Sequence, residues 1–171
     1  MRKLVIVLAL TLAAAIPASA QQINMNFPEL EARAEEVVDI TLDAQMLRMA
    51  SKFFSGRDAD ERAVRDMISG LHGIYVRSYE FAKEGEYDRK IAERLKAQLG
   101  PTWKPLVTVR SKKKENVNIY ANMVGDRVTG LVIISAEPRE FTVVNINGPI
   151  DIERLSQLEG QFGIPELSKE K

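Results

Sequence analysis

The sequence predicts an α+β fold, in which an antiparallel sheet is built on a C-terminal four-stranded meander and helices pack on one face of that sheet. Two observations predict it. Apolar residues recur at helical spacing in much of the first hundred residues, whereas after Gly100 and Pro101 they alternate with polar residues as in strands. The connections between these later segments are very short, and short connections join antiparallel neighbours.

The chain begins with a segment typical of a secretory signal peptide. Arg2 and Lys3 precede an apolar run over residues 4–16, and the small triplet 18–20 forms an A-x-A cleavage site. The apolar run is shorter than the roughly 20 residues that span a bilayer. We therefore expect cleavage between Ala20 and Gln21, a periplasmic or secreted location, and no stable membrane insertion after cleavage.

Cleavage would leave 151 of the 171 residues, which suits one domain. We expect a flexible N-terminus at 21–27, a single α+β domain at 28–165 and a frayed tail at 166–171. The leader carries two cations and no acid, so 22 cations face 24 acids in the remainder, and this balance predicts no binding to nucleic acid. The absence of cysteine excludes disulfides, thiolate catalysis and cysteine zinc sites, and no motif indicates a cofactor.

The first elements mix short helices with one short strand. Pro28 suits the first turn of a short helix that carries Leu30, Ala34 and Val37 on one face. Alternation over 38–42 predicts a brief strand, with a continued helix as the alternative.

Two amphipathic helices are expected next. The first has Asp43 as its N-cap and ends at Gly56. In the second, Asp58 and Glu61 have the spacing of a capping box, and the helix ends at Gly73.

The rest of the chain is expected to be mainly strand. A strand over 74–81 precedes a helix with Ile91, Leu95 and Leu99 on one face. The meander strands are expected at 106–110, 116–124, 128–136 and 141–146.

Three details of the C-terminal part carry further expectations. Gly125 and Asp126 suit a type II′ hairpin, and the fully apolar run 131–134 indicates a central strand. A last helix is expected from about Asp151 to Gly160, with an inward-facing stripe formed by Ile152, Leu155 and Leu158.

Three segments, at 74–81, 130–140 and 158–165, resemble the bacterial exported domain-of-unknown-function family forty-two fifty-two, and the likeness runs from about residue 28 to residue 165. The resemblance implies export and transfers no catalytic residue. Many relatives resemble lipoproteins with a cysteine after the leader, which this chain lacks. Because relatives look to be encoded beside extracytoplasmic sigma and anti-sigma factors, the resemblance also suggests envelope stress signalling.

The candidate binding residues lie on two alternating strands. Tyr75, Arg77 and Tyr79 share one face of the first strand, and aromatic residues beside a guanidinium recur at interfaces. Asn118 and Tyr120 form a similar face on the second meander strand. If the two faces coincide they form a polar and aromatic platform, whereas helices lying over them would place the aromatic residues in the core.

Other chemistry-bearing residues favour structural roles. His72, the single histidine, suits a helix C-terminus. Ser111 and Lys114 have S-x-x-K spacing at a strand end, where this catalytic motif does not act, and the lysines at 112–114 suit a solvated turn or a local contact with anions. Glu137 and Glu140 flank a turn.

The sequence thus favours an exported, non-catalytic module that binds an envelope protein or another component of the cell envelope. A carboxylate-based hydrolase acting on cell-wall or polysaccharide substrates is the alternative.

Overall fold

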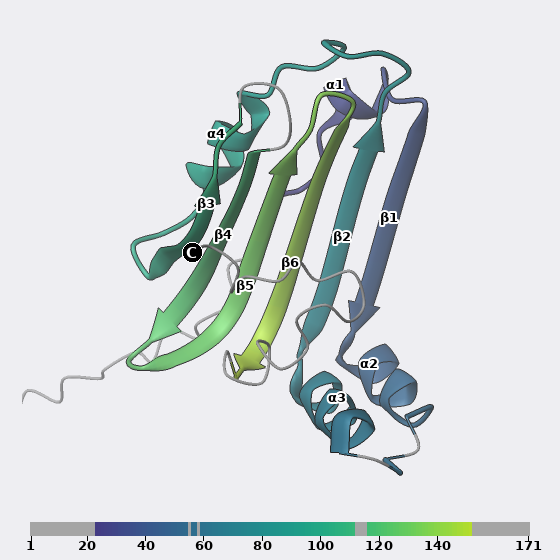
Figure 1. The fold of residues 1–171 in the computed structure, drawn as a ribbon, viewed down its shortest axis with the longest axis vertical. Coiled ribbons are helices and arrows are strands. Elements are labelled where there is room, and N and C mark those ends of the chain that lie inside the picture. The colour runs from purple at the N-terminus through teal and green to yellow at the C-terminus, as the bar shows by residue number, and fades with distance from the viewer. Residues whose placement is uncertain (1–22, 55, 58, 112–115, 152–171) are drawn as a thin grey trace, which may run out of the picture.

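The computed structural model describes residues 23–54, 56–57, 59–111 and 116–151. Within them the chain forms one antiparallel sheet with short helices around it, which confirms the predicted α+β class (Figure 1). In chain order the elements are α1 (Pro28–Glu31), β1 (Glu36–Asp43), α2 (Ala44–Ser51), α3 (Ala59–Gly70), β2 (Gly73–Glu80), α4 (Ile91–Lys96), β3 (Trp103–Val109), β4 (Asn116–Val124), β5 (Arg127–Ala136) and β6 (Glu140–Ile150).

The C-terminal half forms the predicted meander. The strand order across the sheet is β1-β2-β6-β5-β4-β3, so the four last strands are neighbours in chain order and β2 with β1 extends the sheet at β6. Strand β5 lies inside the sheet, as its apolar run predicted. At the β4–β5 hairpin Val124 pairs with Arg127, and Gly125 has a φ of 61°, which the first position of the predicted turn requires.

The N-terminal elements follow the local sequence with shorter helices than expected. Asp43 caps α2 as predicted, because its Oδ1 accepts a hydrogen bond of 2.8 Å from the backbone N–H of Met46. The alternation after α1 gives strand β1 rather than a continued helix, and Val37 belongs to this strand. Asp58 and the helix expected after Asp151 lie outside the described residues.

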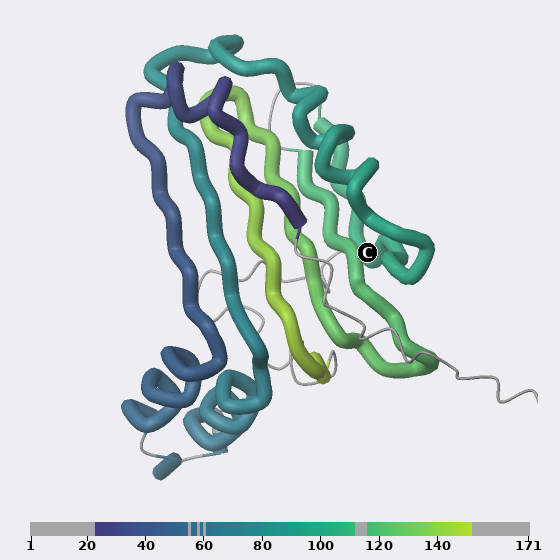
Figure 2. The backbone as a smooth tube through the Cα atoms, turned by 180° about the vertical axis from the view of Figure 1, so that it is seen from behind, coloured from purple at the N-terminus to yellow at the C-terminus, as the bar shows by residue number. Residues whose placement is uncertain are grey.

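Helices α1 and α4 lie on one face of the sheet, as the sequence led us to expect, whereas α2 and α3 lie at one end of the strands. Tyr79, Ile134 and Phe141 mark the face, here the Tyr79 face, that packs against residues 23–27, α1 and α4 (Figure 2). Leu131 marks the opposite face, here the Ile133 face, which packs against Leu47 of α2 at one end of the strands. Since β5 is apolar on both sides, each face of the sheet needs a partner.

Residues 23–27, expected as part of a flexible N-terminus, lie across the Tyr79 face. Ile23 and Phe27 are buried in its core, and the Phe27 ring meets the Phe141 ring edge-on with centroids 5.9 Å apart. The backbone N–H of Asn24 donates to Oε1 of Gln98 at 2.9 Å, which ties the segment to the residues that follow α4. The start of the described chain is therefore part of the fold.

Within the described ranges, no helix is long and apolar enough to cross a membrane.

Candidate functional site

All five candidate binding residues project from the Tyr79 face. The register pairs Tyr75 with Asn145 on β6, then Asn145 with Val132 on β5 and Val132 with Tyr120 on β4. A second row runs in the same way from Arg77 to Asn118 through Val143 and Ile134. The polar faces of β2 and β4 therefore lie on the same side of the sheet and form one platform. Helices cover part of this platform.

Tyr79 belongs to the core of the domain. It is fully buried, its hydroxyl accepts a hydrogen bond from the backbone N–H of Phe27 at 3.1 Å, and it donates one to the carbonyl of Met25 at 3.1 Å. Burial raises the pKa of this hydroxyl. Tyr79 thus anchors the N-terminal segment and offers no surface to a ligand.

Arg77 is a half-buried cation whose charge is compensated. Its guanidinium lies 3.0 Å from a carboxylate oxygen of Asp39 on β1 and 3.6 Å from one of Glu31, and its Cζ is 5.9 Å from the centroid of the Tyr79 ring. Its Nε is buried and has no hydrogen-bond partner among the described residues. Arg77 therefore has little net charge to offer a ligand and one donor to spare.

Tyr75 lines a pocket of about 380 Å³ on the Tyr79 face. Its ring lies against Gly73, where an added Cβ would stand 2.8 Å from the Tyr75 hydroxyl. Asn145 lines the same pocket and is 1% exposed, and its Oδ1 has no partner within the described chain. This pocket combines an unused acceptor with the unused donor of Arg77. The lining residues are Ile23, Asn24, Met25, Asn26, Asp39, Thr41, Tyr75, Arg77 and Asn145.

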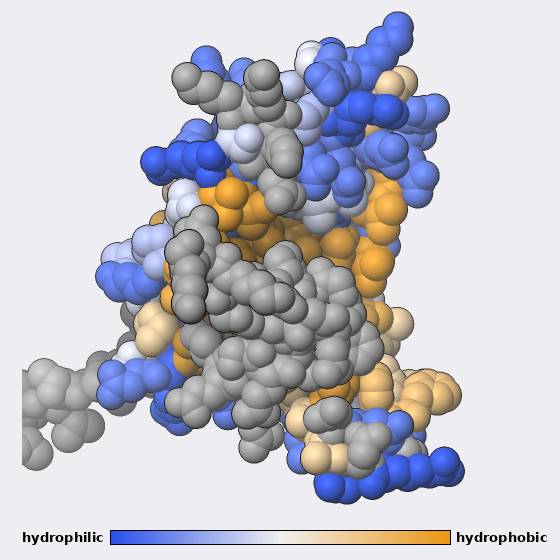
Figure 3. Space-filling model, viewed as in Figure 1, coloured by the Kyte–Doolittle hydropathy of each residue, from blue (hydrophilic) through white to orange (hydrophobic). Residues whose placement is uncertain are grey.

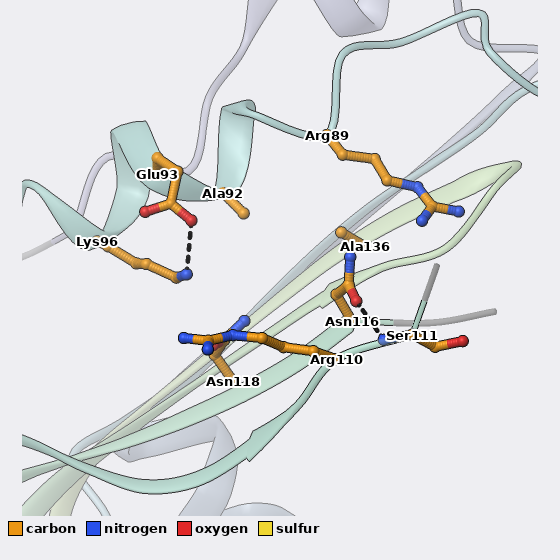
Figure 4. Close-up of a pocket in the computed structure, with 9 residues that line it drawn as sticks. All are labelled: Arg89, Ala92, Glu93, Lys96, Arg110, Ser111, Asn116, Asn118 and Ala136. Atoms are coloured by element: carbon orange, nitrogen blue, oxygen red, sulfur yellow. Dashed lines mark hydrogen bonds and ion pairs between the residues drawn. The ribbon is translucent and has the colours of Figure 1, made fainter. Parts of the chain in front are cut away.

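A larger cleft of about 640 Å³ lies on the Tyr79 face between α4 and the ends of β3 and β4 (Figure 4). Figure 4 shows Glu93 and Lys96 on α4 facing Arg110 and Asn118 on the side of the sheet. The volume is typical of a small-ligand site. The described lining consists of Arg89, Ala92, Glu93, Lys96, Arg110, Ser111, Asn116, Asn118 and Ala136.

The cleft has a cationic lining. Among the described residues, Arg89, Lys96 and Arg110 line the cleft together with one carboxylate, that of Glu93, whose Oε1 lies 2.7 Å from Nζ of Lys96. The two guanidinium groups have no ion-pair partner in the described part of the chain. The described cations of the cleft outnumber its described carboxylate, and an anion bound between the two guanidinium groups would offset their mutual repulsion.

Asn118 forms part of the cleft wall and supplies neutral polar groups. It is 5% exposed, and its side-chain amide makes no hydrogen bond to any described residue. Nearby, Oδ1 of Asn116 accepts a hydrogen bond of 2.7 Å from the backbone N–H of Ser111, which fixes the end of β3 against β4. The cleft thus offers a buried amide beside its cationic groups. Tyr120, the fifth candidate, is half-buried and packs against the core instead.

The remaining chemistry-bearing residues have structural surroundings. His72 is exposed after α3 and its backbone N–H donates to the carbonyl of Asn147. Oε1 of Glu140 accepts hydrogen bonds from the hydroxyls of Ser78 at 2.7 Å and Thr142 at 2.8 Å. Lys114 of the S-x-x-K pattern lies outside the described residues. The described chain contains no group of three metal-ligating side chains that could hold a metal ion.

Sequence reasoning missed the three cations of the cleft and Asn145. Arg89, Lys96 and Arg110 are separated in the chain and meet only because α4 lies over the ends of β3 and β4. Asn145 did carry a signal, since it is an amide between apolar residues of an interior strand. A buried amide in such a strand needs a partner, which directs attention to the pocket beside it.

Comparison with known proteins gives one match. A family model described as Domain of unknown function (DUF4252) matches residues 31–158, which spans every strand of the sheet. No curated protein and no solved structure matches the chain.

Proposed function

The chain belongs to the family described as Domain of unknown function (DUF4252). We propose that it is an exported, non-catalytic module that binds an anionic envelope component. Export rests on the signal-peptide pattern of residues 1–20. The observation that carries the binding function is the cleft of about 640 Å³, whose described lining holds Arg89, Lys96 and Arg110 and one carboxylate, that of Glu93.

The cleft suits a ligand that carries phosphate or carboxylate groups. Arginine presents a planar fork of donors that matches both groups, and Arg89 and Arg110 have their guanidinium groups free within the described chain. The buried amide of Asn118 can hydrogen-bond an uncharged part of the same ligand. The ligand is thus an anionic glycan, an anionic headgroup or an acidic side chain of an envelope partner.

A titration of the processed chain with defined anions tests the proposal. A short polyphosphate and an oligogalacturonate supply phosphate and carboxylate groups, and a neutral maltooligosaccharide serves as the comparison. We expect both anionic oligomers to bind in calorimetry with an affinity that falls as salt rises, because salt screens the contacts. Equal binding of the neutral oligomer would contradict the proposal.

Two charge-reversed variants locate the binding. Arg110→Glu should weaken binding of either anion at least tenfold, because it replaces one of the three cations in the described lining of the cleft by an anion. Arg33→Glu is the matched control, because it makes the same change in net charge. Arg33 is exposed and is not among the described residues that line the cleft. Equal loss in both variants would indicate attraction to the whole protein rather than a site.

In-cell crosslinking then identifies the natural ligand. The tagged chain and its Arg110→Glu variant are crosslinked in the producing bacterium, and the captured components are compared by mass spectrometry. Capture of an envelope regulator by the parent chain alone would support a role in envelope stress signalling. Capture of the same material by both variants would count against the cleft.

The alternative function, a carboxylate-based hydrolase for cell-wall or polysaccharide substrates, requires two carboxylates facing each other across the scissile bond. Glu137 and Glu140 instead flank one turn, and hydrogen bonds from Ser78 and Thr142 hold the Glu140 carboxylate against β2 and β6. In the cleft, the carboxylate of Glu93 is paired with Lys96. These contacts favour the binding module.

A further inference from the structure

The Ile133 face of the sheet carries an apolar row that runs through all six strands. The register aligns one Val or Ile from each strand, without a polar residue between them. The members of this apolar row, from β1 to β3, are Ile40, Val76, Val144, Ile133, Ile119 and Val107.

The described helices leave the apolar row without a cover. Helices α2 and α3 lie at one end of the strands, where Leu47 and Leu71 pack on Leu131 and its neighbours (Figure 1). The side chains beside and within the row stay accessible, with Ile40 41% and Val109 45% exposed. Figure 3 shows hydrophobic residues in a band across this face, directly below the hydrophilic residues of its upper edge. A contiguous apolar surface rimmed by polar residues is typical of a docking site.

We propose that residues 152–165 of the same chain dock on the apolar row. The chain leaves the described structure on this face, because Ile150 is 9% exposed and packs in the same cluster as Leu131 and Val128. A groove of about 520 Å³ begins at this exit. Its described lining consists of Leu106, Met123, Asp126, Arg127, Val128, Pro149, Ile150 and Asp151.

The length of the segment fits the width of the surface. The expected helix at 152–160 would extend roughly 14 Å at about 1.5 Å per residue, and the five residues after Gly160 would add up to roughly 16 Å in an extended chain. The apolar row crosses β6 at Val144, six residues before the exit at Ile150, which is roughly 20 Å along the strand at about 3.3 Å per residue. The edge strand β3 is three strand spacings from β6, which at about 4.8 Å each is roughly 14 Å. The segment therefore reaches from its exit to the edge of the sheet.

The sequence of the segment complements the apolar row. Ile152, Leu155 and Leu158 recur at helical spacing and give one apolar stripe, with Phe162 and Ile164 following. The family match extends to residue 158, eight residues beyond the end of β6, so the domain defined by the family includes the beginning of this segment. A stripe of this kind closes a sheet face by burying its apolar side chains.

Engineered cysteines test the docking directly, because the chain has none of its own. Leu155→Cys is combined with Ile119→Cys on the apolar row, or with Tyr120→Cys, the adjacent residue on the Tyr79 face. A short bismaleimide is then added to the processed chain and the products are sized. We expect crosslinking within single chains for the Ile119 pair and at least tenfold less for the Tyr120 pair.

Three outcomes would overturn the proposal. Equal crosslinking of both pairs would show that the segment has no preferred face. Crosslinking between chains rather than within them would assign the face to a second copy. No crosslinking of the Ile119 pair, nor of equivalent pairs that use Ile152→Cys or Leu158→Cys, would leave the face to another partner.

A second measurement does not depend on crosslinking geometry. Leu155→Asp should raise the fluorescence of the dye ANS several-fold, because displacement of the segment exposes the apolar row. Ser156→Asp, the matched control, adds the same charge one residue away and should leave the fluorescence of the parent chain unchanged. Equal fluorescence of the Leu155→Asp variant and the parent would contradict the docking.

Discussion

Tyr79→Phe should destabilise the domain out of proportion to the single atom removed. The Tyr79 hydroxyl accepts from the backbone N–H of Phe27 and donates to the carbonyl of Met25, each at 3.1 Å. No other described residue bonds to either group. A buried polar group left without a partner costs about 1–3 kcal/mol. We therefore expect the free energy of unfolding to fall by about 2–3 kcal/mol, with the larger part due to the buried N–H of Phe27.

Urea unfolding measures this loss. With a slope of about 2 kcal/mol per molar urea, the unfolding midpoint should fall by roughly 1 to 1.5 M. Tyr75→Phe is the matched control, because Tyr75 lies on the same face of β2 and its hydroxyl makes no hydrogen bond within the described chain. Its stability should change by less than about 0.5 kcal/mol. Equal midpoints for the two variants would refute the role of Tyr79 as anchor of residues 23–27.

Three further predictions concern other parts of the fold. Burial raises the pKa of Tyr87 to about 12. As the pH rises, the unfolded chain loses this proton before the folded chain does. The free energy of unfolding should therefore be unaffected below about pH 10 and fall by about 2–3 kcal/mol as the pH approaches 12. Tyr87→Phe should remove this fall from a plot of the free energy of unfolding against pH. Gly148→Ala should strongly destabilise the domain in thermal unfolding, because φ is 131° and the new Cβ would lie 2.9 Å from the backbone of Leu71, whereas Gly85→Ala, with a φ of 81° and open space, should cost only about 1 kcal/mol. Asp43→Ala should cost about 1 kcal/mol in urea unfolding through loss of the N-cap of α2, and an unchanged midpoint would contradict the capping contact.

The strands and the sheet class could be predicted because their causes are local. Alternation over β4 and β5 and the short hairpin at Gly125 make these strands antiparallel neighbours in any fold. The apolar run of β5 requires cover on both faces, which places this strand inside the sheet. Helix lengths were overestimated because the apolar period continues past the point where a helix ends: α2 ends at Ser51, where the Ser51 hydroxyl donates to the Arg48 carbonyl and the Lys52 N–H to that of Met49.

The candidate site was only partly predictable. Tyr75 and Arg77 do line a pocket, but Tyr79, two residues further along the same strand face, lies under the segment 23–27. Alternation determines which residues of one strand share a face, and it does not determine what lies over each of them.

The sequence by itself determined the signal-peptide pattern, the freedom from cysteine, the antiparallel meander and the sets of residues that share a strand face. Only the tertiary structure decided that β2 pairs with β6, that the two polar strand faces coincide, and that Arg89, Lys96 and Arg110 surround one cleft. The physical reason is distance along the chain. Periodicity and turns act over a few residues, whereas partners such as Tyr75 and Asn145 are brought together by burial of apolar side chains on both faces of the whole sheet.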